Sequence, residues 1–139
     1  MRSFAALLLS LASAYSCPAY ACGKTSAPED VVQAQVDAYN AHDLEAFARC
    51  YADDVTIHDL SGKDPPVKGI PELKKDYEWL AKAPAGLRVE IVKRITSGNI
   101  VIDLERIHGL PKEKGTPEAT AVFEVRDGKI KNVWFPPSK

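Results

Sequence analysis

One carboxylate in this sequence has a position that suits proton transfer, and it belongs to Asp59. Residues 55–59 (VTIHD) alternate between apolar and polar side chains, as in a half-buried β-strand. Val55, Ile57 and Asp59 then share one face, and its apolar members indicate that this face points inward. An unpaired carboxylate among apolar groups has a raised pKa, which suits a general base. The alternative is an aspartate that ends the strand and caps the turn at Ser61 and Gly62.

Further polar and aromatic residues lie on the predicted inward faces of other elements, where they could contact a substrate. Gln35 and Tyr39 are four residues apart, one turn along the same helix face. A buried amide such as that of Gln35 needs hydrogen-bond partners, either from the protein or from a ligand. For the aromatic residues, the alternative is an ordinary place in the core. The predicted substrate-binding residues are Gln35, Tyr39, Tyr51, Tyr77, Trp79 and Phe123.

The histidines and cysteines indicate neither a metal site nor a nucleophile. His42, His58 and His108 fall on separate predicted elements without the spacing of metal ligands, and no Gly-rich phosphate loop is present. His58 should face away from Asp59, because adjacent strand residues point to opposite faces. Cys50 has no evident base partner. We therefore expect chemistry without a metal or a cofactor.

The elements that hold these residues are helical in the first half of the chain and β-stranded in the second. Helices are predicted for residues 28–41, for residues 44–51 and from residue 71 to about residue 85. Strands follow the segment at 55–59 and carry the apolar series Leu87, Val89, Ile91; Ile100, Ile102, Leu104; Ala119, Ala121, Phe123, Val125; and residues 130–135. Asp127-Gly128 predicts a hairpin. This order predicts an α+β domain with an antiparallel sheet.

Residues 40–45 (NAHDLE) and 51–59 (YADDVTIHD) resemble the nuclear transport factor 2-like superfamily, in its ketosteroid isomerase and SnoaL-like branch. The resemblance implies a cone-shaped fold over residues 28–137, with three N-terminal helices packed in a curved antiparallel sheet. It also matches Asp59 to the proton-shuttling aspartate of ketosteroid isomerases. The two oxyanion donors of those enzymes, a tyrosine and a protonated aspartic acid, fall here on Gln35 and Ala121. Because such donors contribute strongly to the rate, we do not expect steroid isomerisation, and Ala121 also disfavours polyketide cyclisation.

The first 21 residues have the features of a secretory signal peptide, although a retained anchor is the alternative. Arg2 precedes an uncharged apolar segment at residues 4–14, and Ala19 and Ala21 form a small-x-small cleavage site. Residues 22–27 would then be a polar tether before the domain. We expect an exported protein that is periplasmic, bound at the outer surface or secreted.

Three fates are open for the two cysteines of the mature chain. Cys22 would be its first residue, as at a bacterial lipoprotein junction, although Ala19 occupies a position where leucine is usual. A lipid anchor at Cys22 is one outcome, and a disulfide between Cys22 and Cys50 is a second. The favoured outcome is a buried free thiol at Cys50, because this residue lies near the apolar stripe of the second predicted helix.

Length and charge narrow the classes of partner. The chain has 139 residues and a formal net charge of −1, which fits one domain without the basic surface that nucleic acids require. No apolar run reaches the roughly 18 residues of a membrane span. We expect an apolar pocket for a hydrophobic small molecule, and a homodimer through the open sheet face, where Val101 and Ile107 interrupt a polar series. The alternative is a non-catalytic domain for ligand binding or protein association.

Overall fold

The computed structural model describes residue 22 and residues 26–138, so the predicted signal segment at residues 1–21 lies outside the described residues. None of the described helices is long and apolar enough to cross a membrane. In chain order the elements are α1 (Pro28–Asn40), α2 (Leu44–Ala48), β1 (Tyr51–Asp59), β2 (Val67–Lys68), α3 (Gly69–Asp76), the 3₁₀ helix η1 (Glu78–Lys82), β3 (Arg88–Ser97), β4 (Ile100–His108), the 3₁₀ helix η2 (Lys112–Lys114), β5 (Glu118–Arg126) and β6 (Lys129–Phe135).

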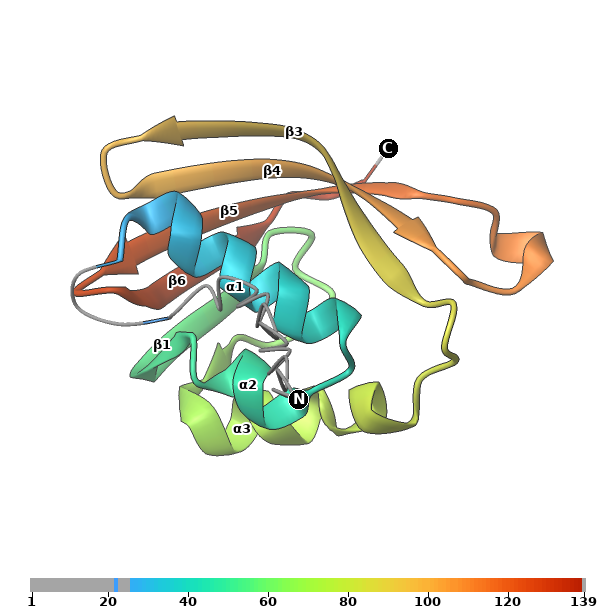
Figure 1. Ribbon diagram of the computed structural model, residues 1–139, viewed down its shortest axis with the longest axis horizontal. Helices are drawn as coiled ribbons and strands as arrows, with labels where there is room; N and C mark the ends of the chain where they lie inside the picture. Colours follow the sequence, from blue (N-terminus) through green and yellow to red (C-terminus); the bar gives the residue numbers. More distant parts are fainter. Residues whose placement is uncertain (1–21, 23–25, 139) are drawn as a thin grey trace, which may run out of the picture.

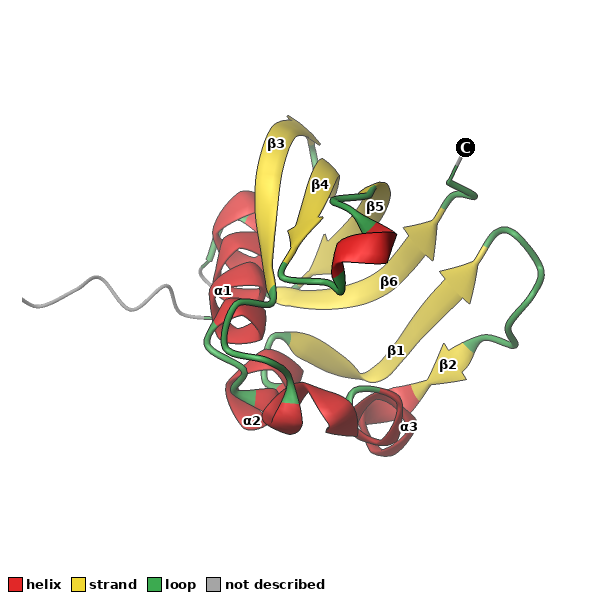
Figure 2. Cartoon of the chain, turned by 90° about the vertical axis from the view of Figure 1, so that its right-hand side faces the viewer, coloured by secondary structure: helices red, strands yellow, loops and turns green. Residues whose placement is uncertain are grey.

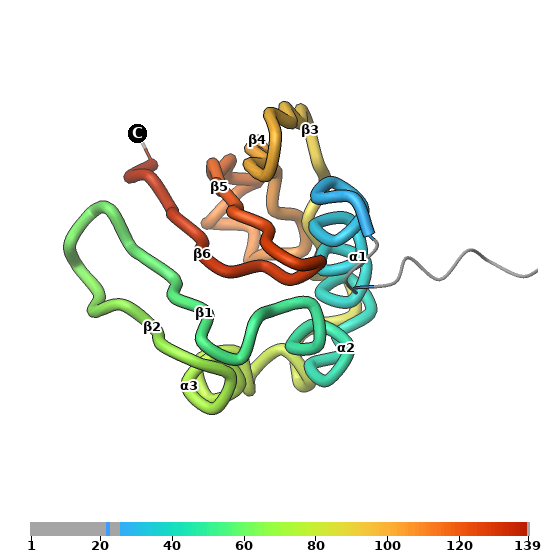
Figure 3. The backbone as a smooth tube through the Cα atoms, turned by 90° about the vertical axis from the view of Figure 1, so that its left-hand side faces the viewer, coloured from blue at the N-terminus to red at the C-terminus, as the bar shows by residue number. Residues whose placement is uncertain are grey.

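The strands form one six-stranded sheet in the order β2-β1-β6-β5-β4-β3. It is strongly bent, α1 lies along its concave side, and α2 and α3 lie beside β1 (Figures 1 and 2). The loop between β1 and β2 lies on the side of the molecule away from α1 and α2 (Figure 3). The α+β class is confirmed, but the antiparallel sheet is corrected to a mixed one. β1 and β6 run parallel, whereas the other neighbours are antiparallel.

The helices differ from the prediction in length and order. Asp43 caps α2 as a sequence N-cap should, accepting a hydrogen bond from the Ala46 amide at 2.9 Å. However, α2 ends at Ala48, and Tyr51 already belongs to β1, because it pairs with Ile130 of β6. α3 follows β1 and β2, so the three helices are not all N-terminal to the sheet.

The core lies between the helices and the concave face of the sheet, and it corrects the predicted facing of β4. Its largest fully buried side chains include Phe47, Leu73, Leu80, Ile130 and Val101. In β4, Val101 pairs with Phe123 and Asp103 pairs with Ala121, and both partners are buried. The inward series of β4 is therefore the one that begins at Val101, and the series that begins at Ile100 points outward. Val101 and Ile107 consequently do not lie on the outer face where we expected a dimer contact.

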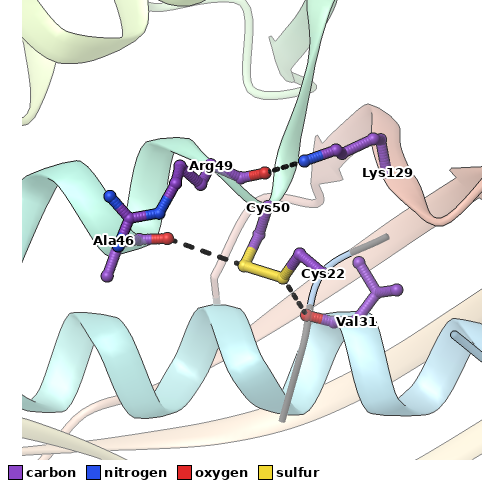
Figure 4. Close-up of a disulfide and its surroundings, with 6 residues drawn as sticks. All are labelled: Cys22, Val31, Ala46, Arg49, Cys50 and Lys129. Atoms are coloured by element: carbon purple, nitrogen blue, oxygen red, sulfur yellow. Dashed lines mark hydrogen bonds between the residues drawn. A yellow bond between two sulfur atoms is a disulfide. The ribbon is translucent and has the colours of Figure 1, made fainter. Parts of the chain in front are cut away.

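A disulfide joins Cys22 to Cys50, with a Cα–Cα distance of 5.0 Å (Figure 4). It fastens the segment before α1 to the turn between α2 and β1. The prediction of a free thiol at Cys50 is therefore wrong, and the disulfide alternative is correct. A lipid anchor would need the same Cys22 sulfur for its thioether, so the anchor and the disulfide exclude each other on one molecule.

Candidate functional site

A cavity of about 350 Å³ lies inside the cone, within the size range of small-molecule sites. Helix α1, strands β3 to β5 and the segment around η1 contribute most of its wall. The lining residues are Gln35, Val36, Tyr39, Tyr51, Asp76, Tyr77, Trp79, Val89, Glu105, Ile107, Ala119, Phe123 and Phe135. All six residues predicted to bind substrate are among them, so the structure brings these six side chains together. Their contact with a substrate stays a prediction.

Aromatic rings form much of the wall, and Phe47 holds two of them in place. Phe47 is fully buried, and its ring centroid lies 4.9 Å from that of Tyr51 and 4.8 Å from that of Tyr77. Trp79, which is 45% exposed, lies 6.3 Å from both Tyr39 and Tyr77. Tyr51 is therefore both a core residue and a wall residue, and Tyr77 packs against the core from the wall. A place in the core and a place in the cavity wall do not exclude each other.

Glu105 is the carboxylate inside this cavity, and sequence reasoning missed it. It projects from β4, is only partly accessible, and has no hydrogen-bond partner among the described residues. Burial and, to a smaller extent, the charge of Asp103 raise the pKa of Glu105 to about 7, against the opposing effect of Arg94. At neutral pH the group therefore exists in both protonation states, which suits a general acid or base. The available signal was the apolar pair Val101 and Ile107, which marks the inward side of β4.

Arg94 does not neutralise Glu105, because it is committed to Asp103. Asp103 is fully buried and accepts two hydrogen bonds of 2.7 Å from the Arg94 guanidinium. A third bond of 2.9 Å runs from Arg94 to the Gln33 side chain on α1. A bulge in β3 between Ile91 and Lys93 shifts the alternation of the strand and turns Arg94 inward. This bonded group fastens α1 to the sheet and leaves Glu105 unpaired.

Gln35 contributes a buried amide oxygen without a donor. The residue is 7% exposed, and its Oε1 has no hydrogen-bond partner in the described part of the chain. The Gln35 side chain lowers the pKa of the neighbouring Tyr51, against the larger effect of burial. Burial raises the pKa of Tyr51 well above its ordinary value. A buried acceptor left without a donor costs about 1–3 kcal/mol, so a ligand that donates here would gain affinity.

Asp59 does not line this cavity, and its surroundings contradict the predicted role as a base. Its carboxylate accepts hydrogen bonds from the Ser61 amide (2.8 Å), the Ser61 hydroxyl (2.6 Å) and the amides of Lys63 and Asp64 (both 3.1 Å). These bonds, the Ser61 hydroxyl first, lower the pKa of Asp59 to about 2. The structure therefore supports the alternative, an aspartate that organises the loop after β1.

An open hollow at the mouth of the cavity shares four of its lining residues, Asp76, Tyr77, Trp79 and Phe135. The β1–β2 loop and α3 form its other sides. Its charged residues are Asp59, Asp64, Glu72, Asp76 and Glu78, with Lys75 as the one basic residue in the lining. The approach to the cavity is therefore predominantly acidic.

The histidines lie outside this site. His58 stacks on Trp134 at 5.8 Å, on the face opposite to Ile57, so the prediction that it faces away from Asp59 is confirmed. His108 bonds Glu90 at 2.6 Å, and His42 bonds the Leu87 carbonyl at 2.8 Å. The described residues contain no group of three or more His, Cys, Asp or Glu side chains that could hold a metal ion.

Comparison with known proteins agrees with this architecture. The sequence profile of the SnoaL-like domain matches residues 32–133, whereas no curated protein matches the chain. Among solved structures, an NTF2-like protein of unknown function from Cytophaga hutchinsonii is 16% identical, with a TM-score of 0.61 over 78% of this chain and 88% of that one. A candidate polyketide cyclase from Sinorhizobium meliloti is 19% identical, with a TM-score of 0.64 over 76% and 93%. An LEH-like epoxide hydrolase from M. tuberculosis is 17% identical, with a TM-score of 0.59 over 78% and 80%. At these identities the likeness concerns the fold alone.

Proposed function

The chain belongs to the SnoaL-like domain family of the nuclear transport factor 2-like superfamily, and from this premise we propose that it binds a hydrophobic small molecule and exchanges a proton with it without a cofactor. Glu105 is the acid–base group. The observation that carries the proposal is a carboxylate inside an aromatic cavity, unpaired and with a pKa of about 7. The pKa of a catalytic base is best placed near the working pH, and Glu105 meets this condition.

The cavity also supplies hydroxyl donors for the charge that proton removal creates. When ionised Glu105 removes a proton next to a carbonyl group, the electron pair moves to the carbonyl oxygen, which then needs a hydrogen-bond donor. The hydroxyls of Tyr39 and Tyr77 are available for this. Burial raises the pKa of both, so they remain protonated donors at neutral pH. Gln35, which we also expected to be a donor, lines the same cavity, and its N–H stays a predicted donor. Reactions of the isomerase, cyclase and dehydratase type begin with such a step.

A base in an apolar cavity can be tested without knowing the natural substrate. 5-Nitrobenzisoxazole is a small aromatic probe that opens when a base removes the proton on its carbon 3. The base takes this proton, the C–H electron pair forms the nitrile, the N–O bond breaks, and its oxygen becomes the phenolate of the single coloured product, 2-cyano-4-nitrophenolate. We expect the wild-type protein and Asp59→Asn to open the probe, with rates that rise as pH passes through about 7, and Glu105→Gln to lose the reaction. If the probe binds but opens equally slowly with all three proteins, the domain is a non-catalytic binding domain.

We propose in addition that the protein is exported. The disulfide supports export, because such bonds form and persist in oxidising compartments. The intact mass of the exported protein tests this directly. We expect a chain that begins at Cys22 and is lighter by two hydrogen atoms than the reduced form. Retention of the first 21 residues would contradict export, whereas a lipid group on Cys22 would contradict the disulfide of the exported chain.

A homodimer through the convex face of the sheet also remains a proposal. Ile95 is 50% exposed on this face, and Ile102, Leu104, Val122 and Trp134 are partly exposed. Apolar surface of this kind favours association. Light scattering of the wild-type protein and Ile95→Lys measures it: a dimer that the substitution dissociates supports the proposal, and a wild-type monomer contradicts it.

A further inference from the structure

Among the described residues, the cavity is lined by acidic, aromatic, aliphatic and amide side chains and by no basic one. Glu105 lies inside it and Asp76 lies at its mouth, and no Lys, Arg or His is among the lining residues. The whole chain is different, because its 18 Lys and Arg nearly balance 19 Asp and Glu. A recess with charge of one sign concentrates its field toward the opening and attracts ions of the opposite sign. The charge of this cavity therefore selects for cations.

The approach to the cavity strengthens this selection. The hollow at the mouth contains Asp64, Glu72 and Glu78, with Lys75 as the one basic residue in its lining. None of these three carboxylates, nor Asp76, forms an ion pair with a basic side chain in the described part of the chain. Their negative charge is therefore directed at solvent and at an entering molecule.

The aromatic rings offer a second attraction for a cation. Tyr77 and Trp79 lie where the cavity meets the hollow, and Tyr39 of the cavity wall is next to them, with Trp79 6.3 Å from each of the two tyrosines. The faces of such rings attract ammonium groups with about 0.5–2 kcal/mol each, depending on desolvation. No lysine or arginine of the described part of the chain lines the cavity beside these rings.

One lining residue of the cavity, Gln35, has an amide oxygen without a hydrogen-bond donor among the described residues. Oε1 of Gln35 is buried without a hydrogen-bond partner in the described residues, and an ionised Glu105 is an acceptor as well. A neutral hydrocarbon would leave both unsatisfied. An ammonium group that carries N–H satisfies an acceptor and supplies the positive charge at the same time.

We propose that the hydrophobic molecule bound in this cavity is an amine that is protonated at neutral pH. Its ammonium group lies among Tyr39, Tyr77 and Trp79, donates to Gln35 or Glu105, and places its apolar part against Phe123 and Phe135. The inference rests on the proposed function, because both take this cavity to be the binding site of the small molecule. It does not depend on catalysis.

Three probes of matched size and similar shape separate the effect of positive charge from the effect of hydrogen-bond donation. Neopentylbenzene is neutral, benzyltrimethylammonium has the same shape with a positive charge, and protonated N,N-dimethylbenzylamine adds an N–H donor. Titrations of the full oxidised protein at pH 8, by calorimetry or NMR shifts, should show both cations binding at least about tenfold more tightly than neopentylbenzene. The protonated amine should bind most tightly.

Two substitutions assign the preference to the cavity. Asp76→Asn removes a charge from an exposed residue at the mouth and should reduce the preference for both cations severalfold. Gln35→Leu should reduce the affinity of the protonated amine more than that of benzyltrimethylammonium, because only the former donates. Equal or tighter binding of neopentylbenzene by the wild-type protein overturns the amine proposal and leaves the proposed proton transfer standing. Binding of none of the three probes, with circular dichroism confirming the fold, contradicts both.

Discussion

Asp59 at the end of β1 and Glu105 in β4 are carboxylates of one bent sheet, and their surroundings differ completely. Asp59 accepts one hydrogen bond from a hydroxyl and three from loop amides, and these hold its pKa at about 2. Glu105 accepts none that the structure describes, and burial raises its pKa to about 7. The comparison shows that an inward-facing position does not make a carboxylate a base. The hydrogen-bond donors around the carboxylate determine its pKa and therefore its role.

The two carboxylates differ in their hydrogen-bond donors because backbone amides are free in the loop after Asp59 and are paired in the strand around Glu105. The chain turns after Asp59, so the amides of Ser61, Lys63 and Asp64 are free to converge on its side chain. The amides around Glu105 belong to a strand that pairs with β3 on one side and β5 on the other. Only a side chain could pair with Glu105, and Arg94, the guanidinium whose charge acts on Glu105, is bound to Asp103.

The largest effect is expected when the charge of Glu105 is removed. Glu105→Gln keeps the shape of the side chain but cannot accept a proton, so opening of 5-nitrobenzisoxazole should slow by about 10²–10⁴-fold, the usual contribution of a positioned general base. Asp59→Asn is the matched control, because it removes the other carboxylate by an equally conservative change. Stopped-flow absorbance measures both variants. Loss of the reaction in Asp59→Asn with retention in Glu105→Gln would reverse the assignment.

A smaller loss should follow when the carboxylate is kept but shortened. Glu105→Asp withdraws the group by one methylene, and a displacement of this size costs roughly 10–10²-fold in rate. The variant should therefore be intermediate between the wild-type protein and Glu105→Gln in the same assay. Rates equal to those of Glu105→Gln at every pH would show that the carboxylate itself is not what acts.

Glu105 should also make the free energy of unfolding depend on pH, in a direction that its raised pKa defines. The pKa of Glu105 is higher in the folded state, about 7, than the usual value of 4.5. The folded protein therefore holds the proton more firmly, and wild-type stability falls as pH rises from about 4.5 to 7. Glu105→Gln should remove this fall, and at pH 8 its free energy of unfolding should exceed that of the wild type by about 1–2 kcal/mol. Urea titrations at pH 4 and pH 8 measure the difference; equal pH dependence in the two proteins would refute it.

The smallest effect, and one of opposite sign, is expected at Asp59. Its pKa is lowered in the folded state, so its stabilising bonds are fully present above pH 4 and are lost as pH falls through about 2. Asp59→Asn should therefore be slightly less stable than the wild type at pH 7 and equal to it below pH 2. Acid titrations followed by circular dichroism compare the two proteins. A variant more stable than the wild type at neutral pH would show that the loop strains Asp59.

Local sequence signals predicted the parts of the site that local structure positions. The helical period placed Gln35 and Tyr39 on the inward face of α1, and the Asp43 cap and the Asp127-Gly128 turn were recognised, the latter with positive φ at both residues. The facing of β4 was missed because apolar residues occur on both of its sides, so alternation alone is ambiguous. The strand register across Phe123 and Ala121, which resolves it, is a long-range property.

The remaining errors also arise from contacts between distant segments. The parallel pairing of β1 with β6 joins residues far apart in the chain, and no local pattern reports it. The disulfide depends on Cys22 reaching the end of α2 in space. The bonds to Asp59 depend on how the loop after β1 closes, whereas its sequence showed only that a turn was present.

Carbon-13 NMR titration of the side-chain carboxyl carbons, assigned with Glu105→Gln and Asp59→Asn, tests the central comparison most directly. The signal of Glu105 should titrate with a midpoint of about 7, and that of Asp59 with a midpoint of about 2. A Glu105 midpoint at or below the ordinary value of 4.5 would contradict the assignment of Glu105 as the acid–base group.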